Sequence, residues 1–402
     1  MRHLNPNSLA FTFLLGSLGA LPPLAIDMSL PSLAQTGAAF GVTGAQAAWT
    51  LSTFMAGFAL AQLVFGALSE RFGRRPVLLS GLALFSVSSF VAALSPTFSW
   101  LLVARFVEGC GAGGGAAMTF AIIRDCFEGS KARTMFAYIT MVIHVAPVIA
   151  PTLGAAVIAF APWPAIYLFL GAASLAQLVV MYFGLGETHK SPDPEATSPS
   201  RLIGGYAKVL ATPAAIGNAL IVALAFGCMF AYISGSANLM MRVLGLSPFA
   251  YAITFALSSG AIIVGTFLSS LVSRRHLPAT IPLWSGLVIA VAASLLLVAI
   301  TATGAVTLPL ALPLVMLVSM AFGLVMPNAM HGAMHPLPQL AGVMGATCGF
   351  LQMTGGSLSA GSVAHFDDGH GPASMAGTMV VASLVAIAVY ALWVRPAEKR
   401  AA

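Results

Sequence analysis

The stretch GALSERFGRRPVLLSG occupies residues 66–81 and joins two long apolar runs. Three arginines and one glutamate stand at its centre, whereas the apolar runs on both sides carry no charged residue. A second stretch, SSLVSRRHLPATIPLWSG at 269–286, also places an Arg-Arg pair just before an apolar run. Short charged loops between apolar runs of about 20 residues are typical of membrane-spanning helices. The faint repeat indicates two related halves, as in many secondary transporters.

The composition of the whole chain excludes a soluble fold. Of 402 residues, 59% are hydrophobic and 7% are charged, whereas a soluble domain carries about 25% charge. With 17 basic and 11 acidic residues, a soluble surface of this size would expose large apolar patches. The net charge of +6 does not predict a nucleic-acid partner, because the basic residues are not gathered on one helix or domain.

Counting the apolar runs predicts twelve membrane-spanning helices. The runs are continuous rather than alternating, so a spanning β-barrel is disfavoured. The predicted fold class is an all-α membrane protein with two pseudo-symmetric six-helix halves. The expected spans are 9–30, 46–66, 76–94, 99–122, 134–158, 164–184, 213–235, 249–271, 281–300, 308–328, 342–363 and 373–394.

A polar, proline-rich stretch near the middle of the chain predicts the boundary between the halves. We expect an N-terminal half over 1–185, a cytoplasmic linker over 186–208 and a C-terminal half over 209–402. The first apolar run leads into Pro22, Pro23 and Asp27 rather than a small-residue cleavage site, so we expect it to be a retained helix.

The basic residues predict the orientation in the membrane. Of the 17 lysines and arginines, all except Arg105 and Arg242 fall on one side if twelve helices are correct, and that side is the cytoplasmic one. Both termini are then cytoplasmic. The fifteen residues are Arg2, Arg71, Arg74, Arg75, Arg124, Lys131, Arg133, Lys190, Arg201, Lys208, Arg274, Arg275, Arg395, Lys399 and Arg400.

Nothing in the sequence predicts a metal site, a cofactor or an enzyme. The four cysteines, Cys110, Cys126, Cys228 and Cys348, form no CxxC pair. His331 and His335 are four residues apart, but the segment GAMHPLP that holds His335 has the pattern of a loop and no carboxylate accompanies them. An intramembrane enzyme would need a nucleophile, a metal cluster or a cofactor motif within the helices, and a channel would need a recognisable filter.

Asp27, Arg105 and Glu108 are the charged residues that fall within predicted spans and carry the functional hypothesis. A carboxylate at membrane depth is costly and usually marks an ion or substrate path, so Asp27 suits a group that takes up and releases a proton. The alternative is that Asp27 hydrates the end of its helix at the interface. Arg105 and Glu108 share one helix face. They form either a pair that responds to protonation or a structural ion pair that holds this helix to a neighbour.

Two further segments are candidates for conformational gating. Charges in the 66–81 loop can pair across helix ends in one conformation and separate in another, although topology alone also explains them. Prolines kink the helix over 134–158, which also holds His144, a weaker candidate for a proton relay. The gate candidates are Gly66, Glu70, Arg71, Gly73, Arg74, Arg75, Pro147, Pro151 and Gly154.

Aromatic residues in the predicted spans are candidates for the wall of a substrate cavity, although each also suits ordinary packing. They are Phe54, Tyr138, Phe226, Phe230, Tyr232 and Phe350.

Several of these motifs resemble those of the major facilitator superfamily. The 66–81 loop is similar to the signature G-x-L-(A/S)-D-R-x-G-R-(K/R), with glutamate at position 70 instead of aspartate. Residues 105–111 resemble the motif R-x-x-Q-G-x-G, and the segment around Pro151 and Gly154 resembles the antiporter motif of drug exporters. IDMSLP at 26–31 and FLQM at 350–353 resemble segments of twelve-helix drug:proton antiporters. Together they point to the Bcr/CflA type of multidrug exporter.

This resemblance implies a proton-coupled antiporter that exports small amphiphilic drugs, such as phenicol- or bicyclomycin-like compounds, by alternating access and confers antibiotic resistance. The substrate is expected near the midplane between the halves, with the chain a functional monomer in the bacterial inner membrane, surrounded by lipid. The alternative is a proton-coupled uptake transporter for a small metabolite. Relatives carry glutamine at position 108, and some carry a second carboxylate earlier in the first helix; Glu108 is therefore a candidate for that second carboxylate.

Overall fold

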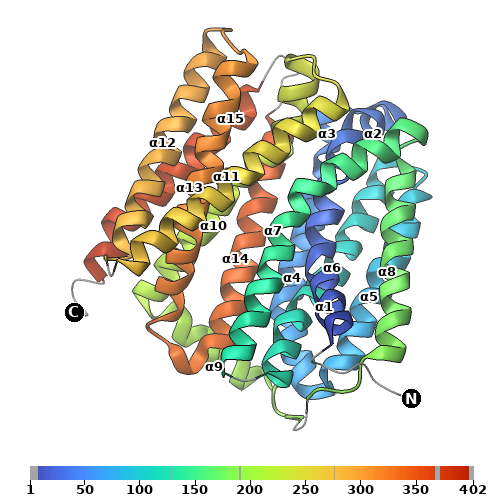
Figure 1. Cartoon of the computed structure of the whole chain (residues 1–402), viewed down its shortest axis with the longest axis vertical. Helices are drawn as coiled ribbons and strands as arrows, with labels where there is room; N and C mark the ends of the chain where they lie inside the picture. The colour runs from blue at the N-terminus through green and yellow to red at the C-terminus, as the bar shows by residue number, and fades with distance from the viewer. Residues whose placement is uncertain (1–7, 128, 190–191, 276, 367–371, 398–402) are drawn as a thin grey trace. The chain divides into compact units, whose positions relative to one another are not determined.

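The computed structural model describes residues 8–127, 129–189, 192–275, 277–366 and 372–397, and these described residues are helical apart from short connections (Figure 1). They divide into two compact units. Unit 1 comprises residues 1–32 and 53–204, and unit 2 comprises residues 33–52 and 205–402. The expected basic residues Arg2, Lys190, Lys399 and Arg400 lie outside the described residues.

Unit 1 is a bundle of long helices whose ends follow the apolar runs of the sequence. Helix α5 packs against both α6 and α8, and α1 packs against α6 and α7. Met28 follows α1, and a 3₁₀ turn (Leu30–Ser32) continues the chain beyond it. The helices are α1 (Leu9–Asp27), α4 (Trp49–Phe72), α5 (Arg74–Ala93), α6 (Phe98–Cys126), α7 (Gly129–Phe160) and α8 (Pro164–Gly184).

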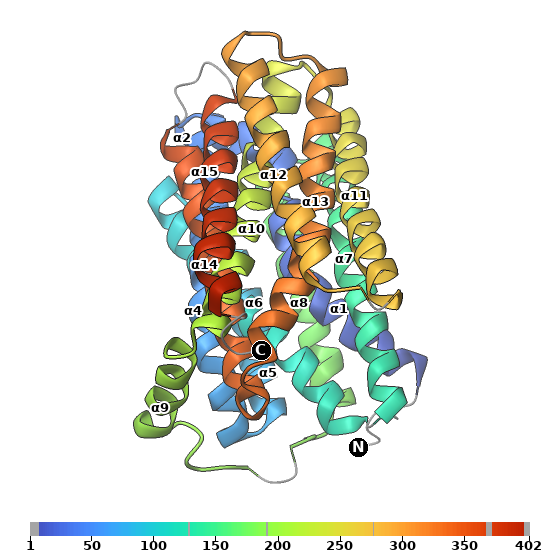
Figure 2. The same cartoon turned by 90° about the vertical axis from the view of Figure 1, so that its left-hand side faces the viewer.

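Unit 2 contains a second set of long helices and three shorter elements. Helix α13 packs against both α11 and α12, which lie beside it in Figure 2, and α10 packs against α14 and α15. The long helices are α10 (Pro213–Ala237), α11 (Pro248–Arg274), α12 (Thr280–Ala302), α13 (Leu308–Met334), α14 (Ala341–His365) and α15 (Ala373–Val389). The shorter ones are α2 (Leu33–Phe40), α3 (Gly44–Ala47) and α9 (Pro199–Leu210), which begins in unit 1.

The expected all-α membrane architecture is confirmed. In the described part of the chain, ten helices are long and apolar enough to cross a membrane. The expected spans at 134–158 and 342–363 correspond to α7 and α14, which are 32 and 25 residues long. In α7 the segment Val145–Phe160 is apolar but too short to count as a span, and α14 is rich in glycine, serine and threonine.

One sequence expectation about loops is wrong, because the segment GAMHPLP begins inside a helix. Short helices also lie between the expected spans: α2 and α3 follow the first span, and α9 lies partly within the expected linker. Helix α13 runs six residues beyond the expected end at 328, so His331 is helical and His335 caps the helix. Pro336 follows this cap; because proline has no backbone N–H, the helical hydrogen bonds stop after the one from His335 to the carbonyl of His331.

Glycines allow the helices of unit 1 to approach closely. A Cβ atom at Gly57 of α4 would collide with the carbonyl of Phe106, and one at Gly109 of α6 would collide with the carbonyl of Phe54. The two backbones are therefore in direct contact. Small residues serve this purpose in membrane helices, and the contact fixes the position of α6, which carries Arg105 and Glu108.

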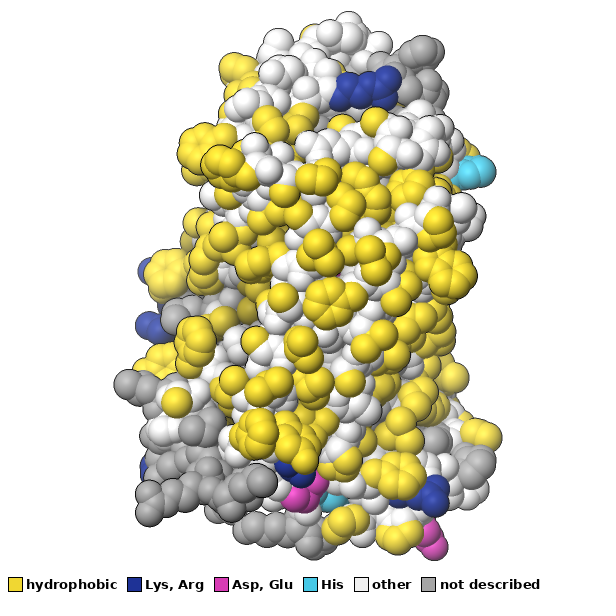
Figure 3. Space-filling model, turned by 90° about the vertical axis from the view of Figure 1, so that its right-hand side faces the viewer, with side chains coloured by type: hydrophobic (Ala, Val, Ile, Leu, Met, Phe, Trp, Pro, Cys, Tyr) yellow, Lys and Arg dark blue, Asp and Glu magenta, His cyan; other side chains and the backbone are white. Residues whose placement is uncertain are grey.

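Side-chain chemistry varies along the surface of the molecule. On the face in Figure 3, hydrophobic side chains cover the middle, and the visible acidic side chains lie near the lower edge. Exposed large hydrophobic residues such as Phe183, Leu296 and Leu358 are expected where lipid rather than water covers the protein.

Candidate functional site

Asp27 is the last residue of α1 and is almost fully buried, with 3% of its surface exposed. A turn at Met28 and Ser29 follows it, within an apolar stretch from Ala10 to Phe40. Its Oδ1 atom has no hydrogen-bond partner. The carboxyl group therefore lies inside the protein, at the end of its helix. A buried carboxyl oxygen without a partner is costly, and such groups mark functional sites.

Arg105 and Glu108 of α6 form an ion pair that is completely buried. The Nη1 atom of Arg105 lies 2.6 Å from Oε2 of Glu108, and neither side chain is exposed. Ser89 of α5 donates a hydrogen bond of 2.6 Å to Oε1 of Glu108. Both oxygens of Glu108 therefore have partners, whereas Oδ1 of Asp27 has none.

Arg105 also connects α6 to α1. Its Nη2 atom donates a 3.2 Å hydrogen bond to the carbonyl oxygen of Ala25, two residues before Asp27. The guanidinium carbon lies 4.4 Å from the ring centroid of Phe54 and 5.4 Å from that of Tyr167. Aromatic faces stabilise a desolvated cation. Arg105 is thus held by an anion, a carbonyl and two rings, and it joins α6 to the segment that carries Asp27.

Gly154 of α7 brings a second helix against the Asp27 segment. A Cβ atom at Gly154 would collide with the carbonyl of Met28, the residue that follows Asp27. Pro147 and Pro151 lie inside α7, which stays helical through both. The side chain of His144 lies outside the part of the chain that the structure describes.

The charged residues between α4 and α5 form a second cluster in unit 1. Arg74 is 5% exposed and contacts Glu70 at 2.7 Å and Asp125 of α6 at 3.0 Å. Its Nη1 atom donates a 2.6 Å hydrogen bond to Oγ of Ser69. The chain turns at Gly73, whose φ of 96° favours glycine. Gly66, by contrast, lies inside α4 rather than in the turn.

Glu187 belongs to the same cluster, although the sequence did not single it out. Its carboxylate accepts hydrogen bonds from the backbone N–H groups of Arg74 at 2.9 Å and Arg75 at 3.2 Å. These are the first two residues of α5, so Glu187 satisfies donors that a helix start leaves unpaired and places negative charge at the helix N-terminus. The contact joins positions more than a hundred residues apart, and no local pattern predicts it.

The segment after Glu187 lies on this cluster too. The Nε2 atom of His189 lies 3.5 Å from Oε2 of Glu70. Arg71 donates a 2.6 Å hydrogen bond to Thr197, and Arg75 donates a 2.7 Å bond to the carbonyl of Tyr182. The predicted gate residues Arg71, Arg74 and Arg75 therefore contact α6, α8 and the segment that follows α8.

The predicted cavity-wall residues are divided between the two units. Phe54 lies under Arg105 in unit 1, whereas Tyr138 of α7 is 51% exposed. In unit 2, Phe226 packs on Phe230 with ring centroids 5.3 Å apart. Tyr232 is fully buried, and its hydroxyl lies 2.7 Å from that of Ser258; Phe350 is half-buried.

A family model of the Major Facilitator Superfamily matches residues 10–364. The chain belongs to this family of membrane transporters, and the predicted twelve-helix, two-half fold class is confirmed.

The similar proteins agree with this family. A relative from Bacillus subtilis (strain 168), an uncharacterized MFS-type transporter called YdgK, is 33% identical over 65% of each chain, slightly under two thirds of its length. The multidrug resistance protein MdtL of Shewanella oneidensis is 29% identical over 87% of each chain. The crystal structure of a D-xylose-proton symporter, 15% identical, has a TM-score of 0.71 and covers 94% of this chain and 97% of that one. This last similarity shows the fold alone.

Proposed function

We propose that this chain is a proton-coupled multidrug antiporter of the Bcr/CflA type that exports small amphiphilic compounds from the bacterial cytoplasm. The observation that carries the proposal is the buried carboxyl group of Asp27, on a segment that the Arg105–Glu108 ion pair contacts through the carbonyl of Ala25. The multidrug resistance protein MdtL, alignable over most of both chains, supports the substrate class.

Asp27 carries the exchanged proton in this proposal. Its Oδ1 atom is buried without a hydrogen-bond partner, so ionisation there meets little local compensation. An incoming proton neutralises the carboxylate of Asp27. The bound substrate, or a positive charge on it, then displaces that proton before export. A carboxyl group that is alternately protonated and ionised couples the two fluxes.

Arg105 and Glu108 position the Asp27 segment. Arg105 reaches the carbonyl of Ala25, while its charge is balanced by Glu108. Glu108 therefore acts as the partner of Arg105, and its candidacy as a second proton-carrying carboxylate stays a prediction. The number of protons that Glu108→Gln releases on substrate binding tests that candidacy, because the loss of a second carrier would lower this number.

The cluster around Arg74 and Glu187 acts as the conformational gate, together with the prolines of α7. Its ion pairs lie at helix ends and are partly exposed, so they can break and re-form as α4, α5 and α6 move. We place this cluster and both termini on the cytoplasmic side of the inner membrane, because the basic residues follow the positive-inside pattern.

The test is a drug-susceptibility panel in a host that lacks its own pumps, with phenicols, bicyclomycin, sulfonamides and lipophilic cations. We expect the wild-type chain to raise the inhibitory concentration of at least one compound and Asp27→Asn to abolish the increase at equal membrane abundance. Undiminished, gradient-dependent export by Asp27→Asn would overturn the proton-carrier assignment. Loss of growth on one nutrient without altered drug sensitivity would favour the uptake alternative.

A further inference from the structure

A cavity of about 1120 Å³ opens at one end of unit 2. It is bounded by the starts of α10 and α12, the end of α13 and residues 392–397 after α15. These ends share the side of the unit on which Arg274 and Arg275 follow the end of α11. Neither the proton site nor the charged cluster of unit 1 uses this cavity.

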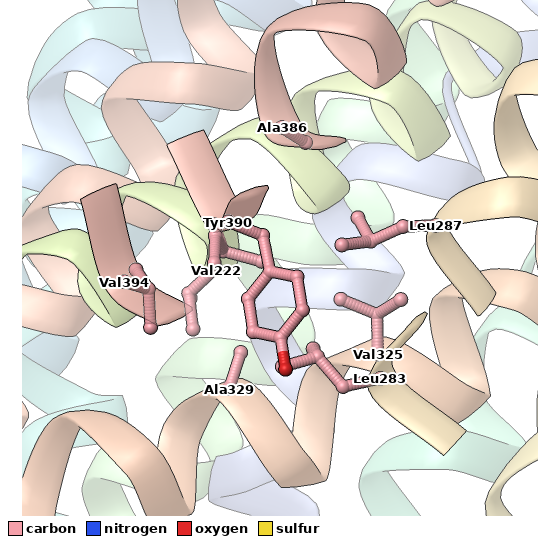
Figure 4. Close-up of a cluster of buried hydrophobic side chains, with 9 residues drawn as sticks. Val222, Leu283, Leu287, Val325, Ala329, Ala386, Tyr390 and Val394 are labelled. Carbon is pink, nitrogen blue, oxygen red and sulfur yellow. The ribbon is translucent and has the colours of Figure 1, made fainter. Parts of the chain in front are cut away.

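The base of the cavity is a packed apolar core. Ile221, Val222, Leu287, Val325 and Tyr390 belong to a cluster of buried side chains from α10, α12, α13 and the end of α15 (Figure 4). Leu283 belongs to this cluster and also lines the cavity. The walls are therefore held by the core of unit 2, so the cavity is preformed.

The polar lining favours an anion. His331 and His335 lie one turn apart on α13, and their ring centroids are 5.6 Å apart. Thr212 and Thr280 add hydroxyl groups from α10 and α12. Among the described lining residues there is no aspartate or glutamate, so no carboxylate opposes an anionic ligand or neutralises a protonated imidazole.

The backbone adds positive potential to the donors that the imidazole rings offer. Helices α10 and α12 both begin at the cavity, and neither has a side-chain hydrogen bond capping its first turn. Unpaired N–H groups at helix starts favour negative charge. Arg395 lies in the neighbouring segment but outside the lining.

The rim of the cavity is apolar. Leu392 is 80% exposed and Trp393 is 42% exposed, and both line the opening. Tryptophan is enriched where a membrane protein meets the lipid headgroups. A ligand that suits this site has an anionic head for the histidines and a hydrocarbon part for the rim.

We propose that this cavity binds the phosphate headgroup of an anionic phospholipid, with His331 and His335 as its ligands and an acyl chain along Leu392 and Trp393. The shared chemistry is a phosphate group, which inorganic phosphate also carries. The apolar rim favours the lipid, and the experiment separates the two sources.

The test is native mass spectrometry of the purified full chain titrated with phosphatidylglycerol or phosphatidylcholine. We expect a preference for phosphatidylglycerol that falls at least about fivefold in His331→Gln/His335→Gln. His365→Gln is the matched control, because His365 is also exposed but ends α14 and does not line the cavity; it should bind like the wild type. A Leu392→Ser variant should weaken lipid binding through the rim while leaving both histidines in place.

Two results would overturn the proposal. One is an unchanged phosphatidylglycerol preference in the double histidine variant when its thermal unfolding matches that of the control. The other is complete displacement of the lipid by millimolar inorganic phosphate, which would make the cavity a site for the soluble ion. Retained binding of the lipid in the presence of phosphate supports the proposal.

Discussion

Unit 1 contains two groups of charged side chains that differ in their surroundings. The pair Arg105 and Glu108 is completely buried between helices, whereas Arg74 lies at a helix end with Glu70, whose side chain is 45% exposed. Water reaches Glu70 in the second group, whereas it reaches neither member of the first. The buried pair Arg105 and Glu108 therefore holds a transport site in place, whereas the pair Arg74 and Glu70 can rearrange.

Removing one member of the buried pair should have the largest effect. Arg105→Met leaves Glu108 buried with Ser89 but without its cation, and we expect a loss of about 3–5 kcal/mol of unfolding free energy. Chemical denaturation of the detergent-purified protein measures it. Arg242→Met is the control, since Arg242 is exposed and should change little. Arg105→Met/Glu108→Gln should recover part of the loss; equal stability of Arg105→Met and the control would contradict the comparison.

The turn between α4 and α5 should give a smaller effect. Gly73→Ala forces a φ of 96° on a residue with a side chain and directs its Cβ at the carboxylate of Glu187. We expect a loss of about 2 kcal/mol. Gly66→Ala provides the opposite case, because Gly66 is helical and its Cβ would meet no atom within 4 Å. That variant should be stabilised by up to about 1 kcal/mol, and destabilisation of both variants alike would argue against this account of the turn.

The acceptor at the start of α5 should have the smallest effect. Glu187→Ala removes the partner of two backbone N–H groups at a position open to water, and loss of such a cap costs about 1 kcal/mol. Glu195→Ala is the matched control, because Glu195 is exposed in the same segment and caps no membrane helix. Unfolding curves of the two variants that superimpose would show that Glu187 contributes nothing at this position.

The sequence predicts the long helices well for a physical reason. A span must be apolar along its whole length, so a run such as 164–184 reports both ends of α8 directly. Short amphipathic helices give no such signal, so the sequence predicts a linker at 186–208 but not helix α9, which lies partly within it. The sequence places the end of α13 too early because Gly332 and Pro336 resemble a turn, although only the proline ends the helix.

The sequence also predicts only part of the candidate site. Asp27, Arg105 and Glu108 stand out because a charge inside an apolar run is rare and costly. Their partners do not stand out: Ser89 and Tyr167 are ordinary membrane-helix residues, and their contacts with Glu108 and Arg105 arise only from packing. Long-range hydrogen bonds thus complete a site whose charged members alone are visible in the sequence.

The proton-carrier role of Asp27 is the central claim, and substrate-induced proton release from the purified protein tests it most directly. A weakly buffered sample receives a compound identified by the susceptibility panel, and a pH-sensitive dye records the protons released. Asp27→Asn should bind the compound and release none, whereas the wild type should release protons; fewer protons from Glu108→Gln would identify Glu108 as a second carrier. Undiminished release from Asp27→Asn would contradict the account.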